Sequence, residues 1–197
     1  MAQAELEDYR KSIIKKNSRP LIEALKKLKL AGAEVLDIGG GSGVIDFELF
    51  KAGIKKAIHV ELSEAYALCF REEAARQLLS EKIISLQGDF LDHHQHIEPV
   101  DLVCLDKVIC CYQNYNDLVT LSARKAKRWY AYVIPRDVWW VKLFDGLKKL
   151  FQLFSRDAFN TYVHPVAEIE NLVAAEGFQK IMEHRNREWL TVIHQRI

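Results

Sequence analysis

The sequence lacks a charge excess, a metal-type cysteine pattern and any long apolar run. Its 28 basic residues against 27 acidic ones leave a net charge of +1, which argues against a general nucleic-acid binder because phosphate neutralisation needs a basic excess. None of the four cysteines forms a C-x-x-C pair, which argues against a zinc knuckle or a thioredoxin-type site. No stretch approaches the roughly 18 apolar residues of a membrane span, and residues 1–17 lack a signal-peptide core. We therefore expect a cytoplasmic, reduced and soluble protein.

The composition favours a folded domain. With 197 residues, 49% of them hydrophobic and 28% charged, the chain can build a substantial core. These values exclude disorder, collagen-like repeats and a disulfide-rich secreted scaffold, and there is no internal repeat. We expect one domain over residues 1–197, made of N-terminal helices (1–32), a core (33–135), a helical cap (136–164) and a last helix with a terminal hairpin (165–197).

Strand-like and helix-like segments alternate along the chain. The predicted strands cover residues 34–38, 57–61, 82–86, 100–105 and 129–134. The predicted helices cover residues 6–30 with an interruption at 17–20, then 46–52, 64–79, 117–126 and 165–176. Two further strands, 178–183 and 188–194, form a terminal hairpin. Such alternation predicts an α/β fold with a doubly wound, largely parallel sheet that helices cover on both faces.

Four of the nine glycines lie within five positions, between a predicted strand and a predicted helix. Glycine there permits a tight turn with positive φ and a close approach of the backbone to a ligand. The dinucleotide pattern G-x-G-x-x-G fails, because Val44 stands at its last position when it is read from Gly39. The pattern that fits is Asp37-x-Gly39-x-Gly41-x-Gly43, which resembles the first motif of class I S-adenosylmethionine-dependent methyltransferases.

The resemblance implies a site for S-adenosylmethionine, with S-adenosylhomocysteine as the product. In that family the glycine loop passes under the methionine and ribose, and an acid at the end of the second strand, here Glu61, accepts hydrogen bonds from the ribose hydroxyls. An acid after the third strand, here Asp89, meets the adenine amino group, and Asp106 occupies the fourth-motif position at the edge of the acceptor pocket. The predicted cofactor-binding residues are Asp37, Gly39, Gly40, Gly41, Gly43, Glu61, Leu62, Asp89, Phe90 and Asp106.

The same resemblance implies a Rossmann-like seven-stranded sheet of order 3-2-1-4-5-7-6 with strand seven antiparallel, and the terminal hairpin suits that topology. All the predicted site residues follow the carboxyl ends of consecutive strands, where open α/β sheets bind ligands. Segments 105–112 and 132–137 also look like the branch that contains magnesium-protoporphyrin O-methyltransferase. That narrower likeness identifies no acceptor.

Residues 139–154 carry an apolar face at helical spacing. Its members are Trp140, Leu143, Phe144, Leu147, Leu150, Phe151 and Phe154. Three interpretations stay open: a cap over an apolar or aromatic substrate, a homodimer or partner surface, and a peripheral helix at a membrane surface.

Catalytic candidates are few. His164 stands at the end of the predicted cap and Tyr112 follows the fourth predicted strand, so each is a candidate to enter an acceptor pocket. The histidines at 93, 94 and 96 are expected in a solvated loop at residues 92–99, because no distant ligand set accompanies them, and we predict no metal site.

The sequence thus predicts an enzyme that transfers a methyl group in line to a small-molecule acceptor. An acidic nucleophile needs little help from a base, so the lack of an obvious acid–base pair is consistent with this. The alternative is a non-catalytic cofactor-binding scaffold or partner subunit with the same fold. A macromolecular acceptor is disfavoured, since no Asn-Pro-Pro-Tyr-like segment follows the fourth strand.

Overall fold

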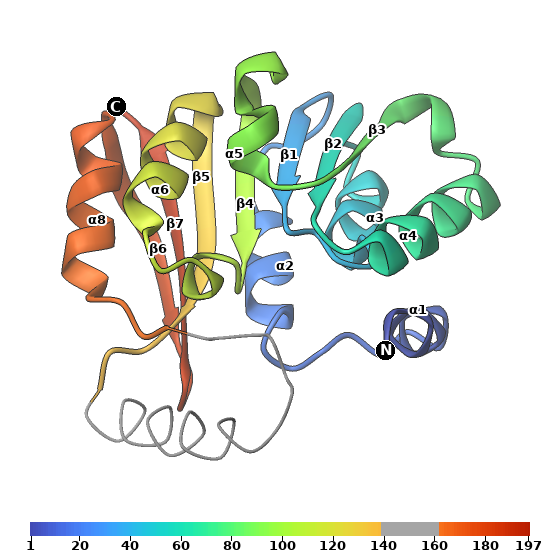
Figure 1. The fold of residues 1–197 in the computed structure, drawn as a ribbon, viewed down its shortest axis with the longest axis horizontal. Coiled ribbons are helices and arrows are strands. Elements are labelled where there is room, and N and C mark those ends of the chain that lie inside the picture. The colour runs from blue at the N-terminus through green and yellow to red at the C-terminus, as the bar shows by residue number, and fades with distance from the viewer. Residues whose placement is uncertain (139–161) are drawn as a thin grey trace.

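The computed structural model describes residues 1–138 and 162–197. A central sheet runs through the molecule with helices on both of its faces (Figure 1). The segment 139–154, with its three interpretations as cap, interface or membrane-surface helix, lies outside the described residues. No helix in the described ranges is both long and apolar enough to cross a membrane.

The sheet has seven strands in the order β3-β2-β1-β4-β5-β7-β6, which confirms the predicted fold class. Strands β1 to β5 pair in parallel, while β7 lies antiparallel to both β5 and β6. The strands are β1 (Glu34–Ile38), β2 (Lys56–Glu61), β3 (Ile83–Gln87), β4 (Val100–Asp106), β5 (Ala126–Pro135), β6 (Phe178–Arg185) and β7 (Trp189–Arg196).

The helices divide between the two faces of the sheet because side chains alternate along each strand. Leu36 and Ile38 of β1 pack with α5, α6 and α8, whereas Val35 packs with α2 and α3. The α-helices are α1 (Ala2–Arg10), α2 (Arg19–Leu25), α3 (Val44–Lys51), α4 (Glu64–Arg76), α5 (Phe90–His93), α6 (Tyr115–Lys125) and α8 (Val166–Ala175). Short 3₁₀ helices are η1 (Ser80–Lys82), η2 (His94–His96) and η3 (Ile109–Cys111).

Two sequence predictions about local structure are wrong. The first helix ends at Arg10, because Ser12 adopts a left-handed φ of 63° and its amide bonds the Tyr9 carbonyl. The three histidines do not form an irregular loop. Asp89 caps α5 by accepting the Leu91 amide, and η2 follows directly. The predicted restart of the helix at Pro20 is confirmed, since proline stands in the first turn of α2.

Helix α1, which begins at the N-terminus, docks beside α4 (Figure 1). The Tyr9 ring stacks on Phe47 of α3 with centroids 5.9 Å apart. Arg10 donates from Nε and Nη2 to Glu73 Oε2 at 3.0 and 2.7 Å. The Glu73 side chain is fully buried, and hydrogen bonds, chiefly from Arg76, lower its pKa to about 2. An anion held in this way attaches α1 to α4 more strongly than apolar contact alone.

Removing the Arg10 side chain is expected to loosen α1 without unfolding the sheet. The lost bonds to a carboxylate, discounted because Arg10 is partly exposed, correspond to about fivefold more frequent opening of α1 in Arg10→Ala. Amide hydrogen exchange of Ala2–Arg10 measures this opening, with β4 as the internal reference. Lys11→Ala is the control, because the Lys11 side chain is exposed and has no ion pair among the described residues. Equal exchange in both variants would contradict the anchoring role.

Candidate functional site

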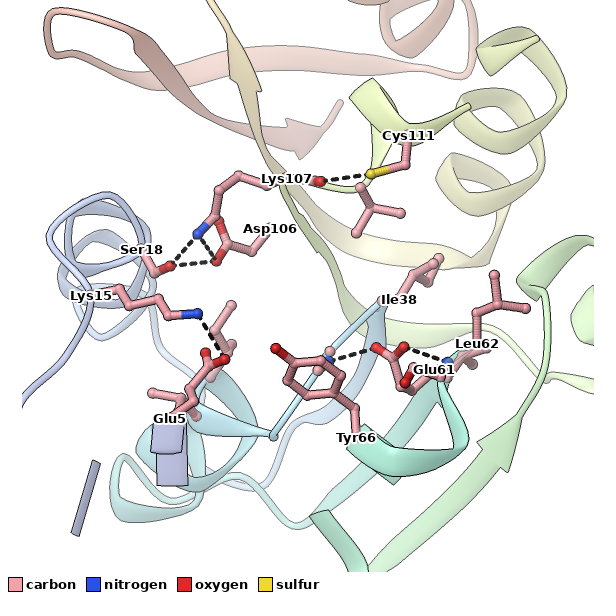
Figure 2. Close-up of a pocket in the computed structure, with 18 of the residues that line it drawn as sticks. Glu5, Lys15, Ser18, Ile38, Glu61, Leu62, Tyr66, Asp106, Lys107 and Cys111 are labelled. Carbon is pink, nitrogen blue, oxygen red and sulfur yellow. Dashed lines mark hydrogen bonds and ion pairs between the residues drawn. The ribbon is translucent and has the colours of Figure 1, made fainter. Parts of the chain in front are cut away.

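A cavity of about 450 Å³ opens at the carboxyl ends of β1, β2 and β4 (Figure 2). Its lining is mostly apolar, and the polar side chains come from residues 5–18, 61–66 and 106–112. The lining residues are Glu5, Asp8, Ile13, Ile14, Lys15, Ser18, Ile38, Gly39, Gly40, Gly41, Val44, Ile45, Val60, Glu61, Leu62, Ser63, Tyr66, Gly88, Phe90, Asp106, Lys107, Val108, Cys111 and Tyr112. Both the volume and the character of the lining suit a small organic molecule.

Glu61 at the end of β2 fastens the glycine loop to the neighbouring helix start. Its Oε2 accepts the Gly41 amide at 2.9 Å, and its Oε1 accepts the Ser63 amide at 2.7 Å. Both partners are neutral amides, and this carboxylate forms no ion pair in the described part of the chain. Each carboxylate oxygen keeps a further lone pair for a ligand. Figure 2 shows the carboxylate between these two amides at the cavity wall.

Three of the four loop glycines are required by the packing of the chain on itself. A Cβ on Gly39 would lie 2.5 Å from Val108 Cγ2, one on Gly40 would lie 2.4 Å from His59 Cε1, and one on Gly43 would lie 2.2 Å from Phe70 Cδ2. Real Cβ atoms do not approach that closely, so none of these positions accepts a side chain unless its neighbour moves. The loop therefore lies directly on buried groups of β2 and α4.

Gly41 differs from its neighbours. Its φ of 57° is left-handed, but a Cβ there would meet only Tyr66, at 3.7 Å. Gly41 also lines the cavity. A side chain at this position would occupy space at the cavity wall.

Beneath the loop lies a buried trio, Asp37, Asp46 and His59. Their possible ligand atoms lie within 4.8 Å of one another, and no other such group of three occurs in the part of the chain that the structure describes. His59 Nδ1 bonds Asp46 Oδ2 at 2.7 Å, and the Cys104 thiol donates to Asp37 Oδ1 at 3.3 Å. These three side chains are of types that bind metals. Hydrogen bonds with protons shared among the three groups account for their close spacing equally well.

Burial governs the protonation of this trio. Burial, with the nearby Asp46 charge, raises the pKa of Asp37 well above its usual value, and burial raises the pKa of Asp46 to about 8. Burial also lowers the pKa of His59, which favours neutral imidazole. A protonated Asp37 can donate to Asp46, so this pair does not hold two full negative charges near neutral pH.

The segment after β3 forms another wall. Gly88 and Phe90 line the cavity, whereas Asp89 between them is not a lining residue. Asp89 Oδ1 accepts both the Leu91 amide at 2.9 Å and the Tyr112 hydroxyl at 2.7 Å. Oδ2 receives no bond from the described residues, which leaves one carboxylate oxygen for a ligand.

A polar triangle closes the opposite end of the cavity. Asp106 Oδ2 accepts the Ser18 hydroxyl at 2.6 Å and lies 3.1 Å from Lys107 Nζ, which donates to Ser18 Oγ at 2.7 Å (Figure 2). Burial raises the pKa of Asp106, against the opposing effect of the Lys107 cation. Lys107 adopts a φ of 64°, a conformation that costs energy for a residue with a side chain. Its amide donates to the Val133 carbonyl, which holds this turn in place.

Most of the predicted site residues come together at this cavity. Those that line it are Gly39, Gly40, Gly41, Glu61, Leu62, Phe90, Asp106 and the catalytic candidate Tyr112. Three predicted cofactor residues, Asp37, Gly43 and Asp89, do not line it. Asp37 is fully buried beneath the loop and Gly43 packs on Phe70, so both act on the cavity only through the loop.

The other catalytic candidate, His164, is not a lining residue. Its Nε2 bonds the Tyr112 carbonyl at 2.8 Å, and its ring packs against Tyr115 with centroids 4.2 Å apart. His164 therefore contacts the segment that carries Tyr112 without lining the cavity itself.

Sequence reasoning missed the contribution of the N-terminal segment. Lys15 and Glu5 form an ion pair of 2.7 Å at the cavity, and Ser18 reaches Asp106 across 88 positions of sequence. No local pattern signals contacts at such separation. Lys107 could have been predicted as a site residue, because it directly follows Asp106 at the end of a predicted strand.

The buried trio predicts a pH dependence of stability. Asp46 titrates near 3.8 when unfolded and near 8 when folded, so the folded state binds more protons between those values. The stability that this group contributes is complete below pH 3.8 and is lost as the pH rises towards 8. Asp46→Asn removes the titrating group, so we expect its free energy of unfolding to fall less steeply over this window. Urea unfolding at a series of pH values tests this, with Asp117→Asn, at an exposed position of α6, as control. Parallel curves for Asp46→Asn and the wild type would contradict it.

The comparisons with known proteins agree with the fold. A scan of protein-family models gives no match, and no curated protein matches by sequence. Among solved structures, the chain is similar to magnesium protoporphyrin IX methyltransferase from Synechocystis PCC 6803 with bound SAH, at 19% identity and a TM-score of 0.73, covering 92% of this chain and 84% of that one. It is also similar to a putative S-adenosylmethionine-dependent methyltransferase from Listeria monocytogenes, at 15% identity and a TM-score of 0.71, covering 89% of this chain and 97% of that one. The predicted resemblance is thus confirmed at the level of architecture: the chain has the Rossmann-like fold of class I methyltransferases.

Proposed function

We propose that this protein is an S-adenosylmethionine-dependent methyltransferase that acts on a small molecule. The observation that carries the proposal is the contact of Glu61 with Gly41 at the cavity wall. It places an acid with two usable oxygens beside a glycine loop, at the carboxyl edge of a sheet of methyltransferase order. At 15–19% identity, the similarity to these structures supports the fold alone. The activity is our inference from the site.

The residues present fit the ribose of the cofactor. The backbone amides of Gly41 and Ser63 orient the Glu61 carboxylate, and each of its oxygens can accept one more hydrogen bond. Two adjacent hydroxyls of a ribose are a matching pair of donors. Because Gly41 has no side chain, the ligand can lie against the loop backbone.

The wall formed by Gly88 and Phe90 is suited to an adenine ring. Phe90 offers an apolar surface, and Leu62, 60% exposed at the cavity, offers a second one. Asp89 Oδ2 is available to accept from an exocyclic amine, while the Tyr112 hydroxyl and the Leu91 amide hold Oδ1. In this proposal Tyr112 is a positioning residue for Asp89.

The reacting end would lie towards Asp106, Lys107 and Ser18. When bound, the cofactor supplies an activated methyl group on a sulfonium centre. The chain's task is then to orient the acceptor and exclude water. Lys107 lines the cavity and can orient an anionic or hydroxyl group of the acceptor, while Ser18 and Asp106 hold its ammonium group in place. The cavity of about 450 Å³ favours a small acceptor over a macromolecule.

The ribose assignment predicts a large effect of Glu61→Gln on cofactor binding. Loss of the charged acceptor is expected to weaken S-adenosylhomocysteine binding by about 1.5–3 kcal/mol, roughly 10- to 150-fold. Isothermal titration calorimetry measures it, and Glu72→Gln on the exposed face of α4 is the matched control. Unchanged affinity in a folded Glu61→Gln variant would refute the assigned role. Binding without turnover of any acceptor would favour the non-catalytic scaffold.

Gly41 allows a test that separates backbone strain from obstruction of the site. Gly41→Ala and Gly32→Ala both place an alanine at a left-handed φ, 57° and 76°, and neither Cβ meets an atom closer than 3.7 Å. We expect similar losses of stability, about 1 kcal/mol each. Only Gly41→Ala is expected to weaken S-adenosylhomocysteine binding, by tenfold or more, because only Gly41 lines the cavity. Equal affinities in the two variants would show that the ligand does not approach this loop.

A further inference from the structure

The proposed function assigns no role to two adjacent cysteines. Cys110 and Cys111 lie in η3, directly after the polar end of the cavity. Both thiols point to one atom, because the Lys107 carbonyl accepts Cys110 Sγ at 3.3 Å and Cys111 Sγ at 3.5 Å. Consecutive residues of a short helix are thereby brought together on one carbonyl oxygen.

The two thiols differ in access. Cys111 is exposed and lines the cavity, whereas Cys110 is 1% exposed and does not line it. The neighbouring Cys111 thiol and burial raise the pKa of Cys110, and Cys111 is the accessible sulfur of the two. The remaining cysteines, Cys69 and Cys104, are buried in different clusters.

We propose that Cys110 and Cys111 form a dithiol binding site for trivalent arsenicals at the wall of the cavity. Two converging thiols can replace both bonds of an As–O group. For phenylarsine oxide, the two thiols add to arsenic, two As–S bonds form, and the oxygen leaves as water with the two thiol protons. Arsenic stays trivalent, so the step needs no oxidant or reductant. Cys111 reacts first because it is exposed, and Cys110 then closes the ring.

Ligand at this site and ligand in the cavity share space. Cys111 and Glu61 both line the cavity. Figure 2 shows Cys111 across the cavity from Glu61. On the proposed function, bound arsenical and S-adenosylhomocysteine therefore exclude or weaken each other, and the coupling is reciprocal.

The test is titration with phenylarsine oxide, read by intact-protein mass spectrometry. Wild type is expected to hold one arsenical that survives excess 2-mercaptoethanol and is removed by dithiothreitol. Cys111→Ser is expected to take up none, whereas Cys110→Ser forms a single-thiol adduct that 2-mercaptoethanol removes. Cys110→Ala gives the same readout if the serine variant misfolds. Cys69→Ser should match wild type, since that thiol is buried elsewhere.

An adduct in Cys111→Ser, or a wild-type adduct as labile as that of Cys110→Ser, would overturn the dithiol site. A second measurement follows S-adenosylhomocysteine affinity before and after arsenical loading, where we expect a loss of at least tenfold. Unchanged affinity would overturn the shared-space argument. If neither form binds S-adenosylhomocysteine, the proposed function fails, while the mass readout still decides the dithiol site on its own.

Discussion

The structure of the site depends on one close contact, that of the Gly40 backbone with His59 and Asp37 beneath it. A single Cβ at position 40 would fall 2.4 Å from the imidazole, so the loop can lie flat only because that atom is missing. With the loop in this position, the Gly41 amide reaches Glu61, and the cavity gains a polar wall. The packing of this turn on the buried side chains therefore also determines the position of the cavity wall.

The cavity is also closed by N-terminal residues that are distant in sequence from the strands. Ser18, at the start of α2, bonds Asp106 at the end of β4, while α1 is anchored to α4 by Arg10 and Glu73. These contacts bring Lys15 and its neighbours to the cavity, which would otherwise be open on that side. The carboxyl edge of the sheet, where the cavity lies, is thus completed by residues that belong to no strand.

The sheet could be predicted from sequence because its signals are local. Apolar runs marked the strands, the glycine spacing marked the loop, and Glu61 and Asp106 stood at strand ends. The order of the strands came from resemblance, since periodicity does not determine which strands pair. The contacts of Ser18, Lys15 and His164 could not be predicted, because each depends on how distant segments pack. The buried position of Asp37 was missed for a related reason: the motif shows spacing but not whether a side chain faces the ligand or the core.

Burial also decides which carboxylates carry charge near the cavity. Asp37 and Asp46 are held towards their protonated forms beneath the loop, and Asp106 is paired with Lys107. Glu61 has only neutral amides as partners, so its charge is the one left uncompensated by a side chain among these four. If both aspartates of the trio were ionised as well, three negative charges would surround one loop and repel each other through a low-dielectric interior. Protonation of the two buried aspartates avoids that repulsion beneath the loop.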